Sequence, residues 1–425
     1  MRGRPVVYDI TRLITRIFNR TPNGIDRVDF AMANYFLDPE RDDRTGLVIT
    51  GLGPRVLAPR AAREAIDNIR EHWGEDDEPD TGEVIAALGG APTTAARISK
   101  RRRGQYRDAL AWIGRHGIPL RRSPRDFLAH GGVYLNVSQF PLWIEGCFRW
   151  LDGRTGIDGY FFVHDLLPLE TPEYFRPEEC LRHARRLATV ARFGQGAIVS
   201  TSLVRDSLQR HLEAIGRPSM PILVAPLPVE PIFARRESIA APIVSGPYFV
   251  MCGTIEPRKN HLLVLHIWRD LVAEFGEAAP KLVLIGAPGW ENEHVIDLLD
   301  RCPGLQRHVI EVSGLPTPSV KRLLAGARAL LAPSFAEGYG LPIVEALSAR
   351  VPVIASDIPV FHEIGAGRIM AIDPTDGPRW RAAICAFACE GSAARRAALA
   401  ALADYAAPDW PSYFGKIEDF IREAR

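Results

Sequence analysis

The chain has 425 residues, of which 47% are hydrophobic and 24% charged, and its formal net charge is +1. This length predicts about two to three domains, and the composition is that of an ordinary globular protein. The balanced charge argues against a nucleic-acid partner, because no positive field would collect phosphate backbones.

The chain shows neither a signal peptide nor a membrane span. Its start, MRGRPVVYDITRL, lacks an uninterrupted apolar region, and no stretch approaches the ~20 apolar residues that cross a bilayer. Six cysteines are scattered, and the one close pair, Cys385 and Cys389, has no further metal ligands nearby. We therefore expect a cytoplasmic protein with reduced, structural cysteines.

The N-terminal half contains short apolar runs typical of buried strands. These runs are VVYDITRL, GLVITGL, VYLNVSQ, YFFVHDL, AIVST and PILVAPL, and amphipathic helices are expected at 24–37, 177–193 and 203–216. Between the second and third runs lies an insertion, about 55–130, with an acidic stretch, EDDEPDTGE, and a basic one, RISKRRRGQYR. Its structure is not predicted by the pattern.

The C-terminal half alternates strands and helices more regularly. Its apolar runs are YFVMCGTI, KLVLIGAP, VIEVSGL, ALLAPS, VPVIASD and IMAID, separated by amphipathic segments such as NHLLVLHIWRDLVAEF. Strands that are apolar throughout and alternate with helices predict a doubly wound parallel sheet. The fold class is therefore α/β, with two Rossmann-like doubly wound domains facing across a cleft.

A proline-rich linker at 226–247 divides the chain. We predict an N-terminal Rossmann-like domain over 1–232, which carries the insertion, and a C-terminal Rossmann-like domain over 246–405. Residues 406–425 should form a C-terminal helix that packs back on the N-terminal domain. Ligands of such sheets bind beyond the carboxyl ends of the strands, so functional residues should follow strands directly.

Two cations follow the strand YFVMCGTI. Arg258 and Lys259 precede a long helix, whose start carries partial positive charge and prefers anions. Arginine offers a two-pronged contact and lysine a point charge, so the pair suits a multiply charged anion. The alternative is a solvated basic turn in which Asn260 caps the helix.

Two acids flank a glycine turn in APSFAEGYGLPIVEALSA. Glu337 precedes the turn, Gly338 and Gly340 permit close backbone approach, and Glu345 lies in the following helix. N–H groups at this helix start could bind phosphate or sugar oxygens. A pair of carboxylates also suggests a general acid and base, whereas the plain readings are a loop acid for Glu337 and a dipole-complementing acid for Glu345.

Two stretches of the N-terminal half are further candidates. His164 ends the strand YFFVHDL and would reach the cleft, unless it is only a loop histidine held by Asp165. Asn23 and Gly24, in RTPNGIDRV, precede a helix and could approach phosphate closely. The chain has no D-x-D pair, phosphate-loop motif, G-x-S-x-G elbow or H-E-x-x-H motif, which weakens the P-loop, esterase and zinc-hydrolase readings.

Together these motifs resemble the C-terminal domain of retaining GT-B glycosyltransferases of family 4. GTIEPRKNHLLVL supplies the R-K pair, and the stretch from VSGLPTPSVKRLL to SDIPVFHEI supplies the E-x7-E motif of Glu337 and Glu345. The detailed match covers about 248–375. TPNGIDRV and VHDLLPLETPEYF look most like mannosyltransferases of bacterial surface-polysaccharide synthesis, although many relatives carry a double glycine where this chain has Asn23-Gly24.

The resemblance implies a role for each matched residue. Arg258 and Lys259 would bind the donor diphosphate, Glu345 the ribose hydroxyls, and Glu337 the donor sugar beside His164. These assignments make Glu337, His164, Arg258 and Lys259 the expected catalytic residues. The remaining expected donor-site residues are Gly253, Thr254, Leu315, Gly338, Tyr339, Gly340, Leu341, Asn23 and Gly24.

The implied activity is metal-independent transfer of a hexose, preferably mannose, from a nucleoside-diphosphate sugar, preferably GDP-mannose. No cofactor or metal is expected, and the acceptor would be a saccharide or a lipid-linked saccharide. The alternatives are a nucleotide-sugar epimerase or glycoside-cleaving enzyme on the same architecture, and a non-catalytic nucleotide-binding protein. The basic run at 97–107 either touches anionic lipid at the inner face of the membrane or is a solvated insertion.

Overall fold

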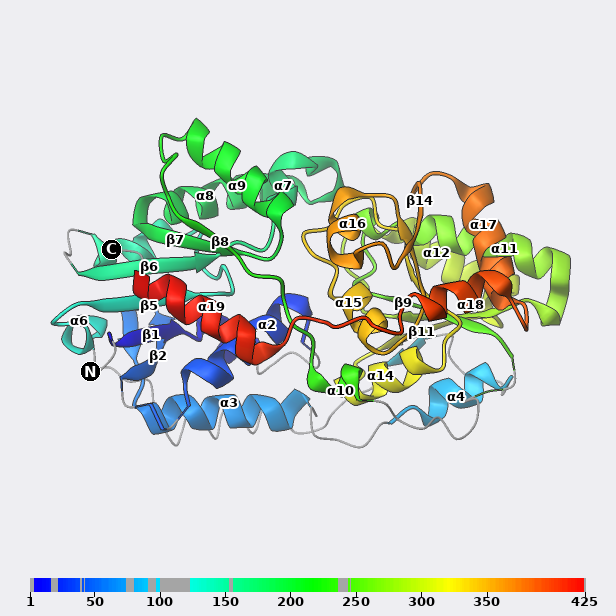
Figure 1. Cartoon of the computed structure of the whole chain (residues 1–425), viewed down its shortest axis with the longest axis horizontal. Helices are drawn as coiled ribbons and strands as arrows, with labels where there is room; N and C mark the ends of the chain where they lie inside the picture. The colour runs from blue at the N-terminus through cyan, green and yellow to red at the C-terminus, as the bar shows by residue number, and fades with distance from the viewer. Residues whose placement is uncertain are drawn as a thin grey trace.

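The computed structural model describes residues 4–16, 22–38, 40–41, 43–73, 80–90, 97–99, 123–152, 156–235, 244 and 246–423. Within these residues the chain forms two seven-stranded sheets, which lie side by side in Figure 1 with helices around each. The predicted α/β fold class with two doubly wound sheets is confirmed.

The N-terminal sheet has the strand order β3-β2-β1-β5-β6-β7-β8, parallel except for the β2–β3 hairpin. All six predicted runs contain a strand, and the hairpin adds β3. The strands are β1 (Val6–Asp9), β2 (Arg44–Thr50), β3 (Gly53–Val56), β5 (Gly132–Asn136), β6 (Ile157–Phe162), β7 (Gly194–Val199) and β8 (Ile222–Val224).

Helices cover both faces of this sheet (Figure 1). The run VVYDITRL is a strand only to Asp9, after which the chain turns into α1. The helices are α1 (Thr11–Arg16), α2 (Gly24–Phe36), α3 (Pro59–Trp73), α6 (Pro124–Phe127), η1 (Glu145–Leu151), α7 (Leu167–Glu170), η2 (Pro172–Tyr174), α8 (Pro177–Phe193) and α9 (Ser202–Ala214).

The C-terminal sheet is parallel throughout, in the order β14-β13-β12-β9-β10-β11-β4. Its strands are β9 (Tyr248–Cys252), β10 (Lys281–Ile285), β11 (Val309–Ser313), β12 (Leu330–Ala332), β13 (Val353–Ser356), β14 (Met370–Ile372) and β4 (Arg97–Ser99). The helices are α10 (Pro231–Ala234), η3 (Pro257–Lys259), α11 (His261–Phe275), η4 (Gly276–Ala278), α12 (Glu293–Arg301), α13 (Pro303–Gln306), α14 (Thr317–Ala325), α15 (Leu341–Ser348), α16 (Pro359–Gly365), α17 (Gly377–Ala388) and α18 (Ala393–Ala400).

The insertion at 55–130 is shared between the two domains. Its helix α3 buries Ala62, Ile66 and Ile69 beneath the N-terminal sheet. Its later part, α4 (Gly82–Leu88) and β4, lies on the C-terminal domain, where β4 extends the sheet beside β11. Residues 100–107 of the basic run lie outside the described residues, so contact with lipid stays a prediction.

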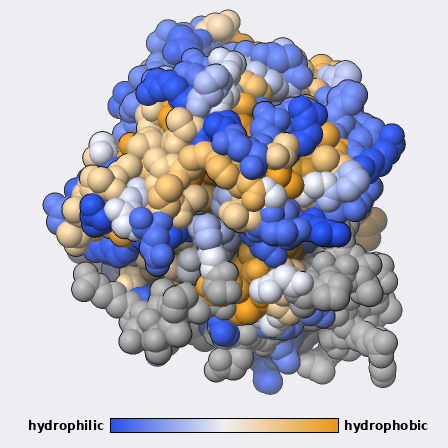
Figure 2. All heavy atoms as spheres, turned by 90° about the vertical axis from the view of Figure 1, so that its right-hand side faces the viewer, coloured by the Kyte–Doolittle hydropathy of each residue, from blue (hydrophilic) through white to orange (hydrophobic). Residues whose placement is uncertain are grey.

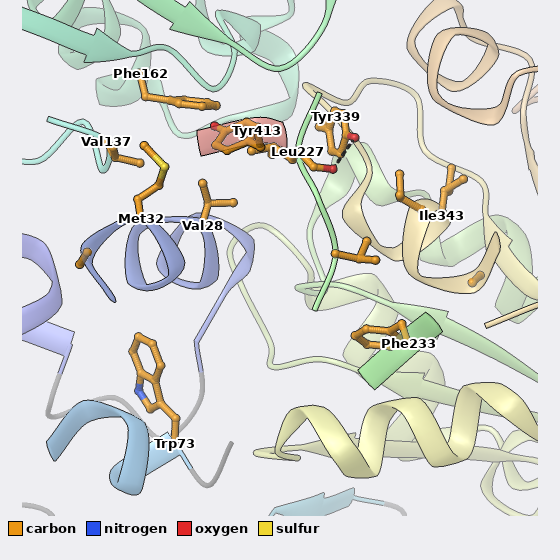
Figure 3. Close-up of a cluster of buried hydrophobic side chains, with 14 of the residues drawn as sticks. Val28, Met32, Trp73, Val137, Phe162, Leu227, Phe233, Tyr339, Ile343 and Tyr413 are labelled. Atoms are coloured by element: carbon orange, nitrogen blue, oxygen red, sulfur yellow. Dashed lines mark hydrogen bonds between the residues drawn. The ribbon is translucent and has the colours of Figure 1, made fainter. Parts of the chain in front are cut away.

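The core is continuous between the domains. Figure 3 shows Val28 and Phe162 of the N-terminal domain in the same buried cluster as Ile343 of the C-terminal domain. Leu227, from the linker, and Tyr413, from the C-terminal helix, lie between them. The two sheets are therefore parts of one packed body rather than independent units on a flexible tether.

Figure 2 shows the end formed by the C-terminal domain, where hydrophilic and apolar side chains are intermixed. Among the described residues, none of the helices combines the length and the apolar content needed to cross a bilayer.

The last helix, α19 (Trp410–Glu423), returns to the N-terminal domain, as the red ribbon in Figure 1 shows. Phe414 stacks on Tyr35 with ring centroids 3.8 Å apart. Glu418 accepts hydrogen bonds from the Tyr35 hydroxyl at 2.7 Å, from Arg41 at 2.6 Å and from Arg44 at 2.7 Å. An aromatic stack and a three-donor carboxylate thus fix this helix to α2 and β2.

Replacing Glu418 with alanine should lower the free energy of unfolding by about 1–3 kcal/mol, because the mostly buried Arg44 would lose its partner. Burial raises the pKa of Glu418, but the hydrogen bonds from Arg44, Tyr35 and Arg41 outweigh it and lower the pKa from 4.5 to about 2. The stabilisation should therefore be present above about pH 4.5 and fade as the pH falls toward 2.

Urea unfolding at pH 7 and at pH 3 measures both effects. Glu423→Ala, at an exposed position of the same helix, is the control. Equal losses for the two variants, or a loss that does not shrink at pH 3, would contradict the assignment.

Candidate functional site

Glu337 lies at the centre of a compact charged cluster in the C-terminal domain. One carboxylate oxygen accepts a hydrogen bond from Arg258 Nη1 at 2.5 Å, and the other accepts bonds from Lys259 Nζ and from Ser334 Oγ at 2.9 Å. Arg258 also contacts Glu256, with 2.6 Å between Nη2 and Oε1. The side chain of Glu337 is 8% exposed, so the cluster is almost closed to solvent.

The backbone after β9 brings the two cations into place. Gly253 has a φ of +141°, and a Cβ there would stand 3.2 Å from Lys259 Cε, so the lysine stem passes directly over this glycine. Asn260 adopts the left-handed conformation, and its side chain donates to the carbonyls of Pro333 and Pro374. Asn260 therefore fixes the turn to neighbouring loops and does not cap α11 with its side chain.

The electrostatics keep Glu337 ionised. Burial alone would raise its pKa, but Arg258 and Lys259 outweigh burial and lower the pKa to about 2. Burial likewise lowers the pKa of Arg258, yet Glu337 and Glu256 raise it above its ordinary value. At neutral pH this cluster is a carboxylate held between two cations, so Glu337 has no proton to donate.

The glycine turn joins this cluster to the start of α15. Gly340 precedes the helix with a φ of +110°, a conformation that favours glycine, and Leu341 is the first helical residue. The hydroxyl of Tyr339 is turned away and donates to the carbonyl of Leu227 in the linker at 2.8 Å. Only the backbone of Tyr339 is thus available for the donor contact expected of it.

The N-terminal domain meets the same turn. A Cβ on Gly338 would lie 2.8 Å from the carbonyl oxygen of His164 and 2.7 Å from Asp165 Cβ, so the two loops touch at this glycine. A Cβ on Gly24 would lie 3.4 Å from Leu341 Cδ1. Two stretches predicted from sequence, at His164 and at Gly24, are therefore assembled around the Gly338–Leu341 turn.

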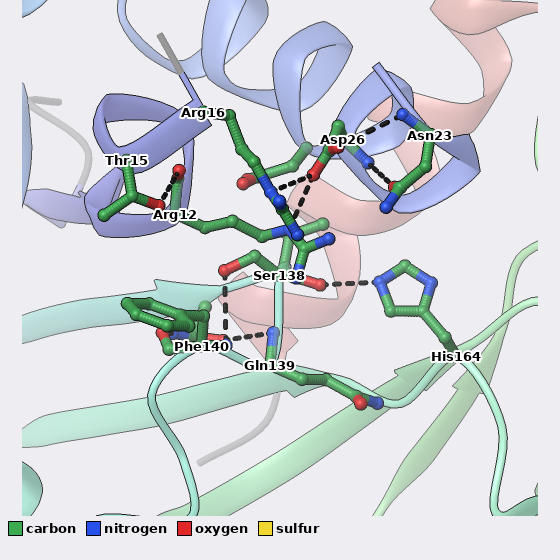
Figure 4. A network of polar contacts seen from close by, with 12 residues as sticks. Arg12, Thr15, Arg16, Asn23, Asp26, Ser138, Gln139, Phe140 and His164 are labelled. Atoms are coloured by element: carbon green, nitrogen blue, oxygen red, sulfur yellow. Dashed lines mark hydrogen bonds and ion pairs between the residues drawn. The ribbon is translucent and has the colours of Figure 1, made fainter. Parts of the chain in front are cut away.

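His164 is a neutral histidine with a defined tautomer. Its Nε2 lies 2.8 Å from the carbonyl oxygen of Val137, which can only accept, so Nε2 carries the hydrogen (Figure 4). Burial lowers the pKa of His164 to about 4. At neutral pH Nδ1 is consequently an unprotonated acceptor.

A polar network supports the loop that begins α2 (Figure 4). Asn23 accepts from the N–H of Asp26 at 2.9 Å, and Asp26 accepts from the N–H of Asn23 at 3.1 Å, which forms a capping box. Asp26 also pairs with Arg12 at 2.6 Å and Arg16 at 3.4 Å. The side chain of Asn23 is engaged in capping, which leaves Gly24 as the residue that approaches the other domain.

Glu345 projects from α15 toward the N-terminal domain. Its Oε1 lies 2.5 Å from Nη1 of Arg27, and the carboxylate side chain is 3% exposed. Arg27 was not among the residues predicted from sequence. The sequence nevertheless held a clue to Arg27. It lies one helical turn after Asn23 and therefore on the same side of α2 as Asn23.

Residues 237–368, which include Arg258, Lys259, Glu337 and Glu345, match the family described as Glycosyl transferases group 1. The chain is therefore similar to this family over the matched part of its C-terminal domain. The resemblance read from the R-K pair and the E-x7-E motif is thereby confirmed.

Several curated relatives of the chain are named as mannosyltransferases. It is 31% identical over 224 residues to the serotype-specific mannosyltransferase WbdA of Escherichia coli, which is 48% of this chain and 26% of WbdA. It is 27% identical over 228 residues to the O-antigen chain mannosyltransferase RfbU of Salmonella typhimurium, 52% of this chain and 58% of RfbU. The chain thus spans about a quarter of WbdA and less than two thirds of RfbU.

Solved glycosyltransferase structures share the fold over nearly the whole chain. HepE of Anabaena, solved with UDP and glucose, superposes with a TM-score of 0.61 over 99% of this chain and 100% of HepE, at 14% identity. Sucrose-phosphate synthase of Thermosynechococcus elongatus gives 0.57 over 99% of both chains, also at 14% identity. These likenesses establish the two-domain GT-B fold.

Two further residues of the predicted donor site are Leu315 and Thr254. Leu315 is buried among the apolar side chains that pack between the sheets and α14. Thr254 packs its methyl group close to Gly289. Within the described ranges, no three His, Cys, Asp or Glu side chains gather as a metal-binding group.

An aromatic contact between the domains flanks the cluster and was missed by sequence reasoning. Tyr174, from the loop after α7, stacks on Phe335 with centroids 5.4 Å apart, and its carbonyl accepts from Trp290 Nε1 at 3.1 Å. Phe335 is two residues before Glu337 in the glycosyltransferase domain. This stack holds the loop that carries Glu337 against the N-terminal domain.

Proposed function

We propose that the chain is a retaining glycosyltransferase that moves a hexose from a nucleoside-diphosphate sugar to a saccharide acceptor. The observation that carries the proposal is the Glu337 carboxylate held between Arg258 and Lys259 beside the start of α15. In that position two cations and the N–H groups of a helix start can bind the diphosphate of a nucleotide sugar. The carboxylate can accept hydrogen bonds from its sugar hydroxyls.

The chemistry of the leaving group accounts for the cations. Cleaving a sugar–diphosphate bond places negative charge on the departing phosphate. Arg258, Lys259 and the N–H groups at the start of α15 are fixed donors that can stabilise this charge in a site closed to water. Because these donors can stabilise the charge themselves, we propose that transfer is metal-independent.

The two carboxylates are better explained as binding groups than as an acid and a base. With a pKa of about 2, Glu337 cannot act as a general acid near neutral pH, and it is a poor base. As an anion it accepts hydrogen bonds from donor-sugar hydroxyls, and Nδ1 of neutral His164 offers a further acceptor. Glu345 would accept from the ribose hydroxyls. Retention would follow from acceptor attack on the face that the phosphate leaves.

Mannose is the preferred sugar and GDP-mannose the preferred donor. Support comes from the relatives WbdA and RfbU, both named as mannosyltransferases, the second of the O-antigen chain. The proposed acceptor is accordingly a saccharide or lipid-linked saccharide of a surface polysaccharide, used at the cytoplasmic side of the membrane. HepE, solved with UDP and glucose, makes UDP-glucose the first competing donor to test.

The test is a donor screen with and without acceptor. Thermal unfolding is followed with GDP, UDP, GDP-mannose and UDP-glucose, where a ligand at 100 times its Kd should add ~2.7 kcal/mol. Stabilising donors are then incubated with methyl α-mannoside or a mannose disaccharide, with and without EDTA. A mannosylated product of retained configuration, formed equally with EDTA, is expected.

Other outcomes would redirect the assignment. Rapid sugar release or isomerisation from the donor alone would favour a glycoside-cleaving enzyme or an epimerase. Nucleotide binding without turnover on any acceptor would favour a binding protein. Activity abolished by EDTA and restored by a divalent cation would overturn metal independence.

A further inference from the structure

Arg27 connects the N-terminal domain to the buried carboxylate of Glu345. Arg27 lies in α2 and Glu345 in α15, so this ion pair joins two helices from different domains. The two helices also approach at their N-terminal ends, where Gly24 lies against Leu341. The pair is therefore one part of an extended contact, and the orientation of α2 fixes where the guanidinium stands.

The burial of this pair makes Arg27 important to Glu345. The side chain of Glu345 is 3% exposed and that of Arg27 is 20% exposed. An ionised carboxylate removed from water requires a counter-charge and hydrogen bonds to remain ionised. Arg27 supplies that charge from across the domain boundary at a separation of 2.5 Å.

The same region contains the proposed diphosphate-binding lysine. The buried thiol of Cys252, at the end of β9, is within electrostatic range of Glu345, Arg27 and Lys259. Glu345 is thus paired with Arg27 of the other domain, and the Cys252 thiol lies in the same region. On the neighbouring α16, His362 pairs with Asp357, and Glu363 accepts from Ser202.

We propose that Arg27 is a positioning residue of the donor site, contributed by the N-terminal domain, which holds the Glu345 carboxylate for the ribose hydroxyls. The inference rests on the proposed function of Glu345. A carboxylate has about four lone-pair positions, so one contact with Arg27 leaves room for two hydroxyl groups. Arg27 orients Glu345 through their ion pair, and the ribose need not displace it.

The ribose subsite is then complete only when the domains are together. The charged contacts to the diphosphate would come from Arg258 and Lys259 of the C-terminal domain. Recognition of the ribose, in contrast, depends on a group from each domain. Binding of a ribonucleotide should therefore stabilise the contact between the two domains more than binding of a nucleotide that lacks the ribose hydroxyls.

The test compares ribonucleotides with their 2′,3′-dideoxy analogues by calorimetry. GDP and dideoxy-GDP are measured with the full-length wild type, Arg27→Ala, Arg27→Lys, Glu345→Gln and the double variant Arg27→Ala/Glu345→Gln, and UDP and its analogue are measured in parallel. The wild type should prefer the ribonucleotide by about tenfold or more, since a hydrogen bond to a charged group has this value. Arg27→Ala should lose most of that preference, and Arg27→Lys should recover part of it.

Two further readouts separate positioning from general damage to the fold. The double variant should be no worse than the single variants, because both changes remove one shared function. In steady-state transfer assays Arg27→Ala should raise the KM for the donor more than it lowers kcat. Glu363→Ala is the matched control, since it removes a different contact between the domains, that of Glu363 with Ser202, and leaves the Arg27–Glu345 pair in place.

The contrary results distinguish failure of the inference about Arg27 from failure of the proposed function. A full ribose preference in Arg27→Ala would overturn the inference while leaving the proposed function in place. Tighter ribonucleotide binding by Arg27→Ala would also overturn it, because Arg27 would then compete with the donor. Loss of preference in the Glu363→Ala control would assign the effect to domain contact in general. If the wild type bound neither GDP nor UDP, the proposed function itself would fail.

Discussion

Glu337→Gln is expected to lower kcat for glycosyl transfer by about 10²–10³-fold while nucleoside-diphosphate affinity stays equal or rises. The amide keeps the shape of the side chain but loses the anion that accepts from the donor sugar. Arg258 and Lys259 then lack the carboxylate that they contact in the structure. A bound diphosphate can take both cations in its place.

Without ligand, Glu337→Gln should also have a lower free energy of unfolding than the wild type. Removing one member of a buried charge cluster costs about 3–5 kcal/mol, because the remaining charges are left uncompensated. Saturating GDP or UDP should recover much of this loss. Steady-state kinetics, calorimetry and thermal unfolding measure the three quantities, with the exposed Glu390→Gln as control. A near-wild-type kcat, or weaker nucleotide binding, would contradict the role given to Glu337.

Lys259→Ala should reduce transfer by about 10²-fold, the effect of removing one fixed donor from a developing charge. Lys259→Arg should restore little, although it restores the charge. The lysine stem lies across Gly253, and the planar guanidinium is too wide for the space that a glycine leaves there. The transfer rate at saturating donor is the measurement for both variants.

The matched control for charge is Arg269→Ala. Arg269 lies in α11, the helix that follows the Arg258–Lys259 turn, and it is half exposed with only a loose contact to Asp270 at 3.8 Å. The Arg269→Ala substitution removes one positive charge without changing the cluster around Glu337. Similar losses in Lys259→Ala and Arg269→Ala would indicate a general charge effect and would refute a specific role for Lys259.

Most of the fold could be predicted because buried parallel strands are apolar on both faces. Runs such as KLVLIGAP and VPVIASD are apolar throughout and too short for a typical helix, so they are best explained as buried strands. The two strands that were missed, β3 and β4, are GPRV and RIS at the edges of the sheets, where no apolar run is required. Helix α3 had a usable signal, since Ala62, Ile66, Ile69 and Trp73 recur at helical spacing.

The site was predictable where one segment carries all of its chemistry. Arg258 and Lys259 directly follow a strand, and Glu337 and Glu345 flank a single glycine turn. Contacts between the domains could not be predicted in this way. The pairing of Arg27 with Glu345 and the stacking of Tyr174 on Phe335 join residues more than 150 positions apart, which only the relative placement of the two sheets brings together.

The placement of α4, β4 and α19 means that neither domain is a continuous stretch of chain. The polypeptide leaves the N-terminal sheet to build β4 beside β11, returns to form β5, crosses again through the linker, and finally sends α19 back. A cut in the linker would therefore divide the protein wrongly. The first fragment would keep the edge strand of the other sheet, and the second would keep the helix that completes the first domain. Each domain therefore depends on a segment from the other half of the chain: β4 for the C-terminal sheet and α19 for the N-terminal domain.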